Sequence, residues 1–199
     1  MPEKRIRIYM TGVGGQGTLT ATTLLARVAL DQGLSVVAGE VHGMAQRGGV
    51  VESVVLLGGW QSPKLDHGEA DILLGFEPLE TLRGLPYLAP EGVVFSSTDF
   101  LPPLNVSLGK DVLPSLDEVK AAVAAVARQS FFMPCRELGL QAGSVQCGNT
   151  VLLGTLCASA LLPFGLDALE AGIRKHLPAK LVEGNIKALH LGVEAMGSL

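Results

Sequence analysis

A cluster of glycines constrains this chain more than any other feature, because it separates a strand-like run from a helix-like run near the N-terminus. An alternating, β-branched run ends at Thr11, and glycines follow at positions 12, 14, 15 and 17. Apolar residues then recur at helical spacing, at Ala21, Leu24, Leu25 and Val28. In this context of strand, turn and helix, the pattern Gly12-x-Gly14-x-x-Gly17 has a physical meaning as a binding turn.

The chemistry of this first glycine loop (residues 12–17) suits an anion. Glycines allow a tight turn and let a ligand approach bare backbone amides, and the helix start that follows presents unpaired N–H groups. These groups favour a phosphate or a carboxylate. Gly12, Gly14, Gly15 and Gly17 are therefore candidate cofactor-binding residues, together with Gln16 at the helix start. The alternatives are that the glycines only form a turn that fits the sheet and that Gln16 only caps the helix.

A second polar loop (residues 42–49), here called the second glycine loop, carries His42, Gln46 and Arg47 close together and ends in Gly48 and Gly49. An arginine flanked by glycines can form bidentate hydrogen bonds to a phosphate or a carboxylate, and the loop amides add donors. We expect all five residues to take part in cofactor binding. Arg47 could instead bond carbonyls of its own loop, and His42 could be an ordinary hydrogen-bonded packing residue.

Glu40 ends the next expected strand, residues 34–40, roughly where a dinucleotide-binding fold places the acid that holds a ribose hydroxyl. The residues that follow depart from that fold. A long strand is expected over residues 50–57 with no helix before it, which breaks the alternation of strands and helices. Glu40 therefore remains a weaker candidate for a ribose contact.

The rest of the chain predicts an α/β domain. Nearly all-apolar runs at residues 70–76 and 91–97 indicate strands covered on both faces. Helices are expected over residues 77–82, 115–129, 148–162, 166–176 and 180–196, with Ser115 as an N-cap and Glu118 three residues later. The Pro-rich segment 99–114 is expected to be a connector with room for one short edge strand. We expect one Rossmann-like, three-layer domain over residues 1–199, with a mostly parallel sheet and C-terminal helices.

Composition narrows the class of protein. The 199 residues are 48% hydrophobic and 17% charged, which suits either a large core or a surface that a partner covers. The net charge of −4 gives no basic footprint for nucleic acid. No apolar run is long enough to cross a membrane, and the N-terminus has no signal-peptide core, so we expect a cytoplasmic protein.

Few residues outside the two loops carry chemistry. Cys135, Cys147 and Cys157 are too far apart for a metal-binding pair and are expected to be small buried residues. The histidines at 67, 176 and 190 lack ligand spacing and are expected at the surface or in packing. The sequence shows no Ser-His-Asp or Gly-x-Ser-x-Gly arrangement that would indicate a hydrolase. We expect no catalytic residue and no metal held by this chain alone.

Three stretches together resemble a known family: Gly12-Val-Gly-Gly-Gln-Gly17, Glu40-Val-His-Gly-Met-Ala-Gln-Arg-Gly-Gly49, and Gly148-Asn-Thr-Val-Leu-Leu-Gly154. Over nearly its whole length the chain is similar to the gamma-type subunit of 2-oxoacid:acceptor oxidoreductases. The second stretch favours the indolepyruvate:ferredoxin type, because pyruvate-type members usually carry Glu-Val-Arg-Gly-Gly there.

The resemblance implies a subunit of an enzyme that oxidatively decarboxylates a 2-oxoacid, here an aryl pyruvate, to an acyl-CoA. It implies that thiamine diphosphate and iron–sulfur clusters lie in a partner subunit, that ferredoxin accepts the electrons, and that this chain helps to receive coenzyme A. It also raises the expectation that Asn149, otherwise an ordinary N-cap by position, faces a subunit junction.

Two other hypotheses remain open at the level of sequence. The first is a self-sufficient nicotinamide or flavin oxidoreductase that uses the first glycine loop, although no proton-relay residues accompany the motif. The second is a stand-alone homologue, a homo-oligomer when isolated, that kept the fold and lost the partner. Neither the 2-oxoacid nor the stoichiometry of assembly can be read from the sequence.

Overall fold

The strand, glycine turn and helix expected near the N-terminus are present as β1, Ile6–Val13, and α1, Thr18–Asp31. The computed structural model describes residues 4–42, 49–103, 106, 108–110 and 112–197. Ile6, Ile8 and Met10 alternate along β1 and are buried in one cluster with the apolar residues of α1. Apolar residues recur every second position in β1 and about every 3.6 positions in α1, so each element has one apolar face, and these two faces pack against each other.

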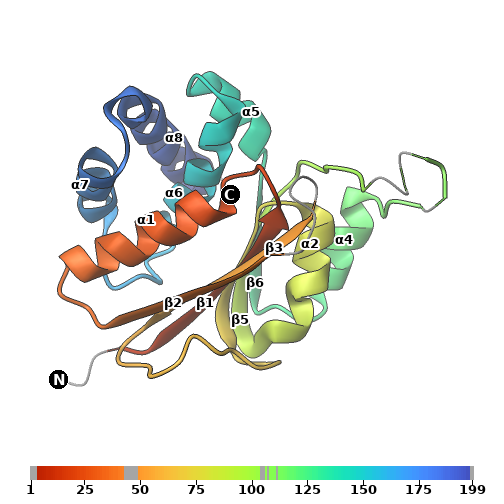
Figure 1. Cartoon of the computed structure of the whole chain (residues 1–199). Coiled ribbons are helices and arrows are strands. Elements are labelled where there is room, and N and C mark those ends of the chain that lie inside the picture. The colour runs from red at the N-terminus through yellow and green to blue at the C-terminus, as the bar shows by residue number, and fades with distance from the viewer. Residues whose placement is uncertain (1–3, 43–48, 104–105, 107, 111, 198–199) are drawn as a thin grey trace.

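Six described strands form one sheet in the order β2-β3-β1-β4-β5-β6 (Figure 1). The other strands are β2, Val36–His42; β3, Val50–Leu57; β4, Ala70–Gly75; β5, Leu88–Ser97; and β6, Gln129–Met133. The pairs β1–β4, β4–β5 and β5–β6 are parallel, whereas β3 runs antiparallel to both β1 and β2. The expected mostly parallel sheet is confirmed, and the strand that follows a strand without a helix is β3.

Helices cover both faces of the sheet, so that the fold has three layers (Figure 1). One face carries α1 together with α6, Gly148–Ala158; α7, Leu166–His176; and α8, Ala179–Gly197, with α5, Cys135–Gln141, packed on α6. The other face carries α2, Pro78–Gly84, and α4, Leu116–Ala124. Two 3₁₀ helices, η1 at Leu85–Tyr87 and η2 at Val145–Cys147, lie in connections.

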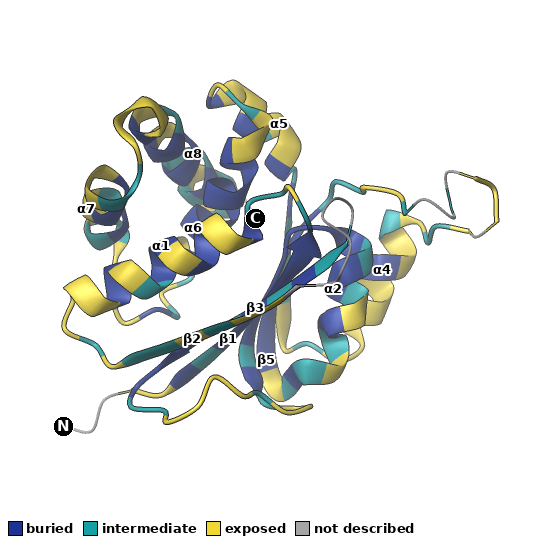
Figure 2. Cartoon of the chain, in the orientation of Figure 1, coloured by how far each residue is buried: buried dark blue, intermediate teal, exposed yellow. Residues whose placement is uncertain are grey.

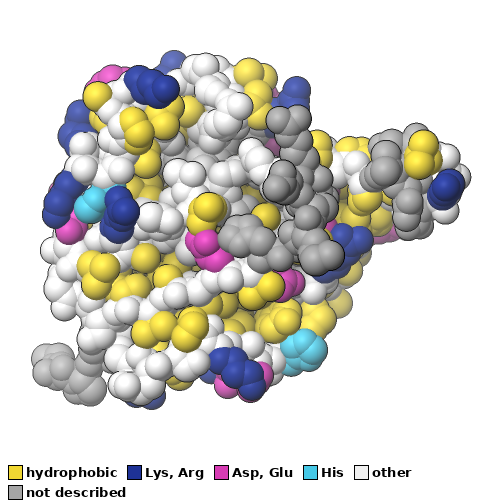
Figure 3. Space-filling model, viewed as in Figure 1, with side chains coloured by type: hydrophobic (Ala, Val, Ile, Leu, Met, Phe, Trp, Pro, Cys, Tyr) yellow, Lys and Arg dark blue, Asp and Glu magenta, His cyan; other side chains and the backbone are white. Residues whose placement is uncertain are grey.

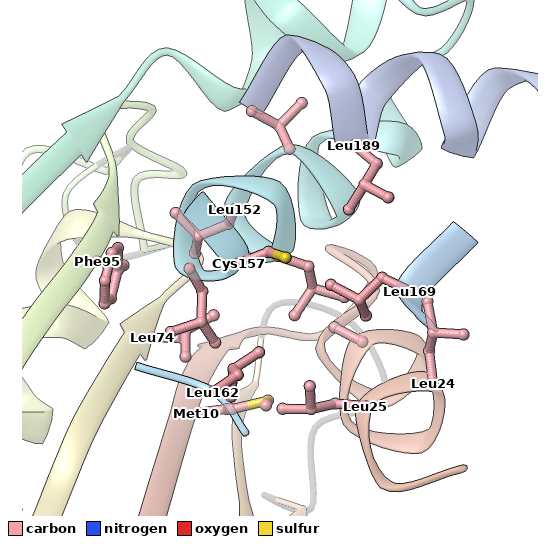
Figure 4. Packing of buried hydrophobic residues seen from close by; sticks show 14 of the residues in the cluster. Met10, Leu24, Leu25, Leu74, Phe95, Leu152, Cys157, Leu162, Leu169 and Leu189 are labelled. Atoms are coloured by element: carbon pink, nitrogen blue, oxygen red, sulfur yellow. The ribbon is translucent and has the colours of Figure 1, made fainter. Parts of the chain in front are cut away.

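The larger core lies between the sheet and the C-terminal helices. Figure 2 shows the central strands buried, whereas α1 exposes its outer side. α6 lies deepest: ten of its eleven residues are buried, as expected for a helix that is apolar all round. Its Leu152 packs in the same cluster as Met10, Leu74 and Leu189 (Figure 4). None of the described helices is both long and apolar enough to cross a bilayer.

The structure corrects the expectations for the middle of the chain. The helix expected over residues 115–129 ends at Ala124, although its capping box is confirmed by hydrogen bonds between Ser115 and Glu118 in both directions. Gln129 instead begins β6, and α5 follows; neither element was expected. The described part of segment 99–114 contains no strand. The helix expected over residues 148–162 ends at Ala158.

The overextended helix at 115–129 and the missed strand β6 share one physical cause. The segment Gln129–Met133 is only five residues long, and its parallel pairing with β5 supplies the hydrogen bonds that make it a strand. Such pairing is non-local, and the residues from 125 to 129 contain no glycine or proline to mark the end of the preceding helix. The local sequence pattern therefore predicts a helix that runs on into the segment that forms β6.

Candidate functional site

The first glycine loop lies where connections from two neighbouring strands leave the sheet in opposite directions. The chain passes from β1 to α1 on one face and from β4 to α2 on the other, although β1 and β4 are parallel neighbours (Figure 1). In open α/β sheets, such a switch point opens a crevice at the carboxyl ends of the strands, and ligands bind there. The topology alone therefore makes the first glycine loop the leading candidate site.

Glycine is required at two points of this loop. Gly15 and Gly17 have φ values of 101° and 82°, in the left-handed region that side chains disfavour. Gly12 still belongs to β1, and a Cβ there would lie 3.0 Å from the Phe76 Cβ atom and 2.8 Å from the Thr18 Oγ1 atom. The glycines thus serve both a tight turn and a close approach.

The side chain of Gln16 holds the turn from within. Its Oε1 atom accepts from Val13 N at 2.8 Å, and its Nε2 atom donates to Phe76 O, at the end of β4, at 3.1 Å. Both ends of the amide are therefore engaged with the protein's own backbone. The side chain of Gln16 therefore does not cap α1, as the structural alternative supposed; it holds the turn instead, and the residue also borders a cavity described below.

The start of α1 has no internal counter-charge. Gly17 occupies the N-cap position without a side-chain cap, and no acidic residue stands in the first turn. Thr18 Oγ1 is buried there and makes no hydrogen bond with a described residue. An uncapped helix start with spare donors attracts an anion.

The second glycine loop meets the first through the backbone. Gly14 N donates to Gly49 O at 2.9 Å, so the two segments are in contact at the switch point. His42 ends β2, where its backbone pairs with Val51, and the expected loop therefore begins one residue after it. Gln46, Arg47 and Gly48 lie outside the described residues.

Asn149 is part of the site in a way that its sequence position did not indicate. The expectation that it is an N-cap is wrong, because α6 begins at Gly148 and Cys147 is the N-cap residue. Its Nδ2 atom instead donates to Gly17 O at 3.0 Å, across 132 residues of sequence. The Thr150 hydroxyl lies between the side-chain oxygens of Asn149 and Asn185, which links the first glycine loop to α8.

Two cavities flank the loop, and Gly14, Gly15, Gln146 and Asn149 line both of them. The smaller, of about 290 Å³, is also bordered by residues that follow the parallel strands: Phe76, Ser97, Asp99, Phe100, Cys135 and Arg136. The larger, of about 720 Å³, extends along the starts of α1 and α8. It is lined by Thr18, Leu19, Thr20, Leu177, Leu181 and Asn185 among others. The switch point is therefore hollow on both sides of the loop.

Asp99 and Cys135 shape the smaller cavity, and sequence reasoning assigned neither of them to the site. Asp99 Oδ2 accepts from Ser97 Oγ at 2.9 Å and from Arg136 N at 2.7 Å, which joins the end of β5 to the start of α5. Burial raises the pKa of the Cys135 thiol to about 12, so it stays protonated at neutral pH and is no nucleophile.

The other sulfur and imidazole groups have packing or surface roles, as expected. All three cysteines are free and buried. His176 lies 2.7 Å from Asp31, His190 lies 2.9 Å from Glu170, and His67 contacts the Tyr87 ring edge-on. Within the described residues, no group of His, Cys, Asp and Glu side chains is arranged to hold a metal.

Glu40 does not lie where a ribose-binding acid would. β2 continues past it to His42, and β3 is inserted between β2 and β1. Glu40 borders neither cavity at the first glycine loop and instead lines a third one on the sheet face. The inserted strand thus removes the acid from the position that a dinucleotide fold requires.

Comparison with known proteins agrees with this topology. The family model described as pyruvate ferredoxin/flavodoxin oxidoreductase matches residues 7–195. The chain belongs to this family. It is 41% identical to indolepyruvate oxidoreductase subunit IorB of Pyrococcus horikoshii, with 96% of each chain covered. It is 38% identical to the subunit of the same name from Archaeoglobus fulgidus, with 94% of each covered.

Solved structures show the same fold. The gamma subunit of a keto/oxoacid ferredoxin oxidoreductase from Geobacter sulfurreducens superimposes with a TM-score of 0.71 at 22% identity, with 98% of this chain and 99% of that chain covered. A 2-oxoglutarate:ferredoxin oxidoreductase from Magnetococcus marinus has the same TM-score at 18% identity, and the match spans 32% of that longer chain. The family match and the relatives that are 38% and 41% identical identify the chain as a subunit of a 2-oxoacid:ferredoxin oxidoreductase.

Proposed function

We propose that this chain is the subunit of an indolepyruvate-type 2-oxoacid:ferredoxin oxidoreductase that completes the active site and presents its two glycine loops to coenzyme A. The enzyme would convert an aryl pyruvate to an acyl-CoA and pass electrons to ferredoxin. The full-length relatives named indolepyruvate oxidoreductase subunit support the substrate class. Coenzyme A and succinyl-CoA are bound in the Magnetococcus relative, which supports the ligand.

The observation that carries the proposal is the hydrogen bond from Gly14 N to Gly49 O at the switch point. It brings Gly49, the last residue of the second glycine loop, against the first glycine loop, which leads into the uncapped start of α1 between two cavities. Backbone donors and a helix start are suited to a phosphate group, and the larger, mostly apolar cavity is suited to a long flexible arm. Coenzyme A combines both chemical parts.

The proposal assigns different binding roles to the residues of the two glycine loops. Gly15, Gly17 and Gly49 supply backbone donors, Gly14 uses its own N–H to hold Gly49 and allows close approach, and Gly12 and Gln16 hold the turn. We assign phosphate pairing to Arg47 and further polar contacts with the ligand to His42, Gln46 and Gly48. No residue of this chain is assigned to the chemical step.

The cofactors that do the chemistry would be carried by a partner. Thiamine diphosphate activates the oxoacid carbon when it is bound, and iron–sulfur clusters take up the electrons. The donor set of this chain does not fit a cluster, because its three cysteines stand far apart in the sequence and no group of described His, Cys, Asp and Glu side chains is arranged to hold a metal. A thiamine- and cluster-bearing subunit is therefore the proposed partner, in the cytoplasm, where ferredoxin is reduced.

Arg47→Ala tests the phosphate role in the assembled complex. Loss of a charge-assisted pair costs about 1.5–3 kcal/mol, so we expect the KM for coenzyme A to rise roughly 10- to 100-fold. Decarboxylation of the oxoacid without coenzyme A should proceed at the wild-type rate. Arg27→Ala, which removes an exposed charge from α1, is the matched control and should leave both rates unchanged. Equal loss of both half-reactions in an intact complex would contradict the assignment.

A further inference from the structure

The third cavity lies away from the first glycine loop, on the sheet face that α2 and α4 share. These helices pack on β1, β4, β5 and β6. The neighbouring part of that face, on β2 and β3, is bordered instead by the segment from Ser62 to Leu65. A cavity of about 380 Å³ remains there, with Tyr9, Glu52, Val54 and Tyr87 in its wall.

The cavity wall is acidic and incompletely paired. Glu52 is half-buried on β3 and forms no ion pair with a described residue. Tyr9 is 3% exposed, and its Oη atom has no hydrogen bond of normal geometry within the described residues, although the Glu52 carboxylate lies beside it. Glu80, 2% exposed on α2, lies outside the lining of this cavity; it pairs one oxygen with Arg83 and leaves the other without a described partner. Buried polar atoms in this state are costly to the isolated chain.

The Glu52 carboxylate influences both Tyr9 and Glu80. Burial and then the adjacent Glu52 carboxylate raise the pKa of Tyr9, so the phenol stays protonated and faces Glu52 as a donor. Burial also raises the pKa of Glu80; the nearby Arg83 lowers it in part, and the charge of Glu52 raises it again. Lys64 at the rim is already paired with Asp66 at 3.2 Å. The cavity therefore has an excess of negative charge.

The aromatic residues add a flat surface. Tyr9 and Tyr87 stack with ring centroids 4.5 Å apart and an angle of 19° between the planes. An arginine guanidinium stacks on aromatic faces and donates to carboxylates in a planar fork, which an ammonium does not do. Val41, 66% exposed on the edge strand β2, and Val54 supply apolar surface around the acidic group. Figure 3 shows hydrophobic side chains gathered with acidic ones over the strands on the viewed face.

We infer that this cavity is a docking site for an arginine side chain from the partner subunit, which pairs with Glu52 and the Tyr9 hydroxyl and stacks on Tyr87. The inference rests on the proposed function, because it requires that subunit to exist. It adds an interaction surface on the sheet face, distinct from the cavities at the first glycine loop. Among the described residues the Glu52 carboxylate has no ion-pair partner, and assembly supplies one.

Glu52→Gln tests the inference with the purified thiamine-bearing subunit as the probe. We expect the dissociation constant for that subunit to rise at least tenfold and its salt dependence to become weaker. The melting temperature of the isolated variant should equal or exceed that of the wild-type chain, because a repelling charge is removed. Tyr87→Leu, which keeps apolar volume and loses the aromatic face, should also weaken association. Glu91→Gln, an exposed acid on β5, is the matched control.

Any other result of these binding and melting measurements overturns either the inference or the proposed function. If the wild-type chain does not bind the subunit, the proposed function fails, and the inference fails with it. If the wild-type chain binds and Glu52→Gln binds equally well, only the inference is overturned. A fall in the melting temperature of the isolated Glu52→Gln chain would show that this chain itself neutralises Glu52. A free arginine or alkylammonium salt that binds with similar affinity would instead indicate a small-molecule site.

Discussion

At the scale of single residues, the site depends on side chains and glycines that serve the backbone. Both ends of the Gln16 side-chain amide form hydrogen bonds with main-chain groups, and the Asn149 side chain on α6 donates a hydrogen bond to the Gly17 carbonyl. Neither is positioned to act as a catalyst. Their contacts fix the turn and leave the amides of the α1 start available, which is what an anion site requires.

Gly17→Ala tests the turn, and Gly33→Ala is its matched control. Both glycines have left-handed φ values, 82° and 75°, so each alanine should cost about 1–2 kcal/mol for its backbone alone. A Cβ atom at position 17 would also collide with Asn149 Nδ2, whereas nothing lies within 4 Å of one at position 33. We therefore expect the larger loss of stability for Gly17→Ala in urea unfolding. Equal losses would show that the contact with Asn149 is unimportant.

Glu80→Gln tests the electrostatic effect of burial. Burial raises the pKa of Glu80 above its ordinary value of 4.5. An acid that binds its proton more tightly when folded adds stability below its unfolded pKa, and this stability is lost as the pH rises through the folded pKa. The wild-type chain should thus lose more stability than the variant does as the pH rises from below 4.5 toward neutral. Urea titrations across this range would measure the difference, and identical losses would refute it.

At the scale of elements, α6 and α8 form the closest helix pair and hold the larger cavity in place. A Cβ atom on Gly154 would collide with the Leu189 carbonyl oxygen, and one on Gly192 would collide with the Val151 carbonyl oxygen. The two helix backbones therefore touch through glycines on both sides. Asn149 at the start of α6 and Asn185 on α8 carry this contact to the first glycine loop.

Gly154→Ala and Gly192→Ala should each destabilise the chain by about 2–3 kcal/mol, because backbone atoms cannot move aside as a flexible side chain would. Gly184→Ala on the same α8 is the matched control. Its nearest contacts, at 3.3 and 3.4 Å, are looser, and alanine favours the helix. It should stay within about 1 kcal/mol of the wild-type chain. Thermal and urea unfolding would measure the difference, and a control as damaging as the other two variants would refute the account.

At the scale of the whole molecule, sequence patterns predicted those elements of the fold that interactions between residues close in sequence determine. The glycine turn, the capping box at Ser115 and the apolar strands β4 and β5 carry short-range signals. β6 does not, because it becomes a strand only by pairing with β5. Likewise, the amide of Asn149 reaches Gly17 across 132 residues, and no spacing in the sequence indicates such a contact.

Some parts of the candidate site were likewise predictable from the sequence, and others were not. The first glycine loop was predicted from its residues, and the structure places it at a switch point between two cavities. Its contact with Gly49 and the participation of Asp99 depend on the order of strands in the sheet, which the sequence does not state. The binding roles of residues 12–17 and 42–49 stay predictions.

The most direct test of the central claim is purification of this chain, tagged at one end, from its native cells. Thiamine diphosphate, iron and indolepyruvate-dependent formation of an acyl-CoA would then be measured in the eluate. The account predicts a stoichiometric larger subunit that carries thiamine diphosphate and iron, with reduction of ferredoxin that depends on coenzyme A. A colourless chain that elutes without a partner and without this activity would contradict it.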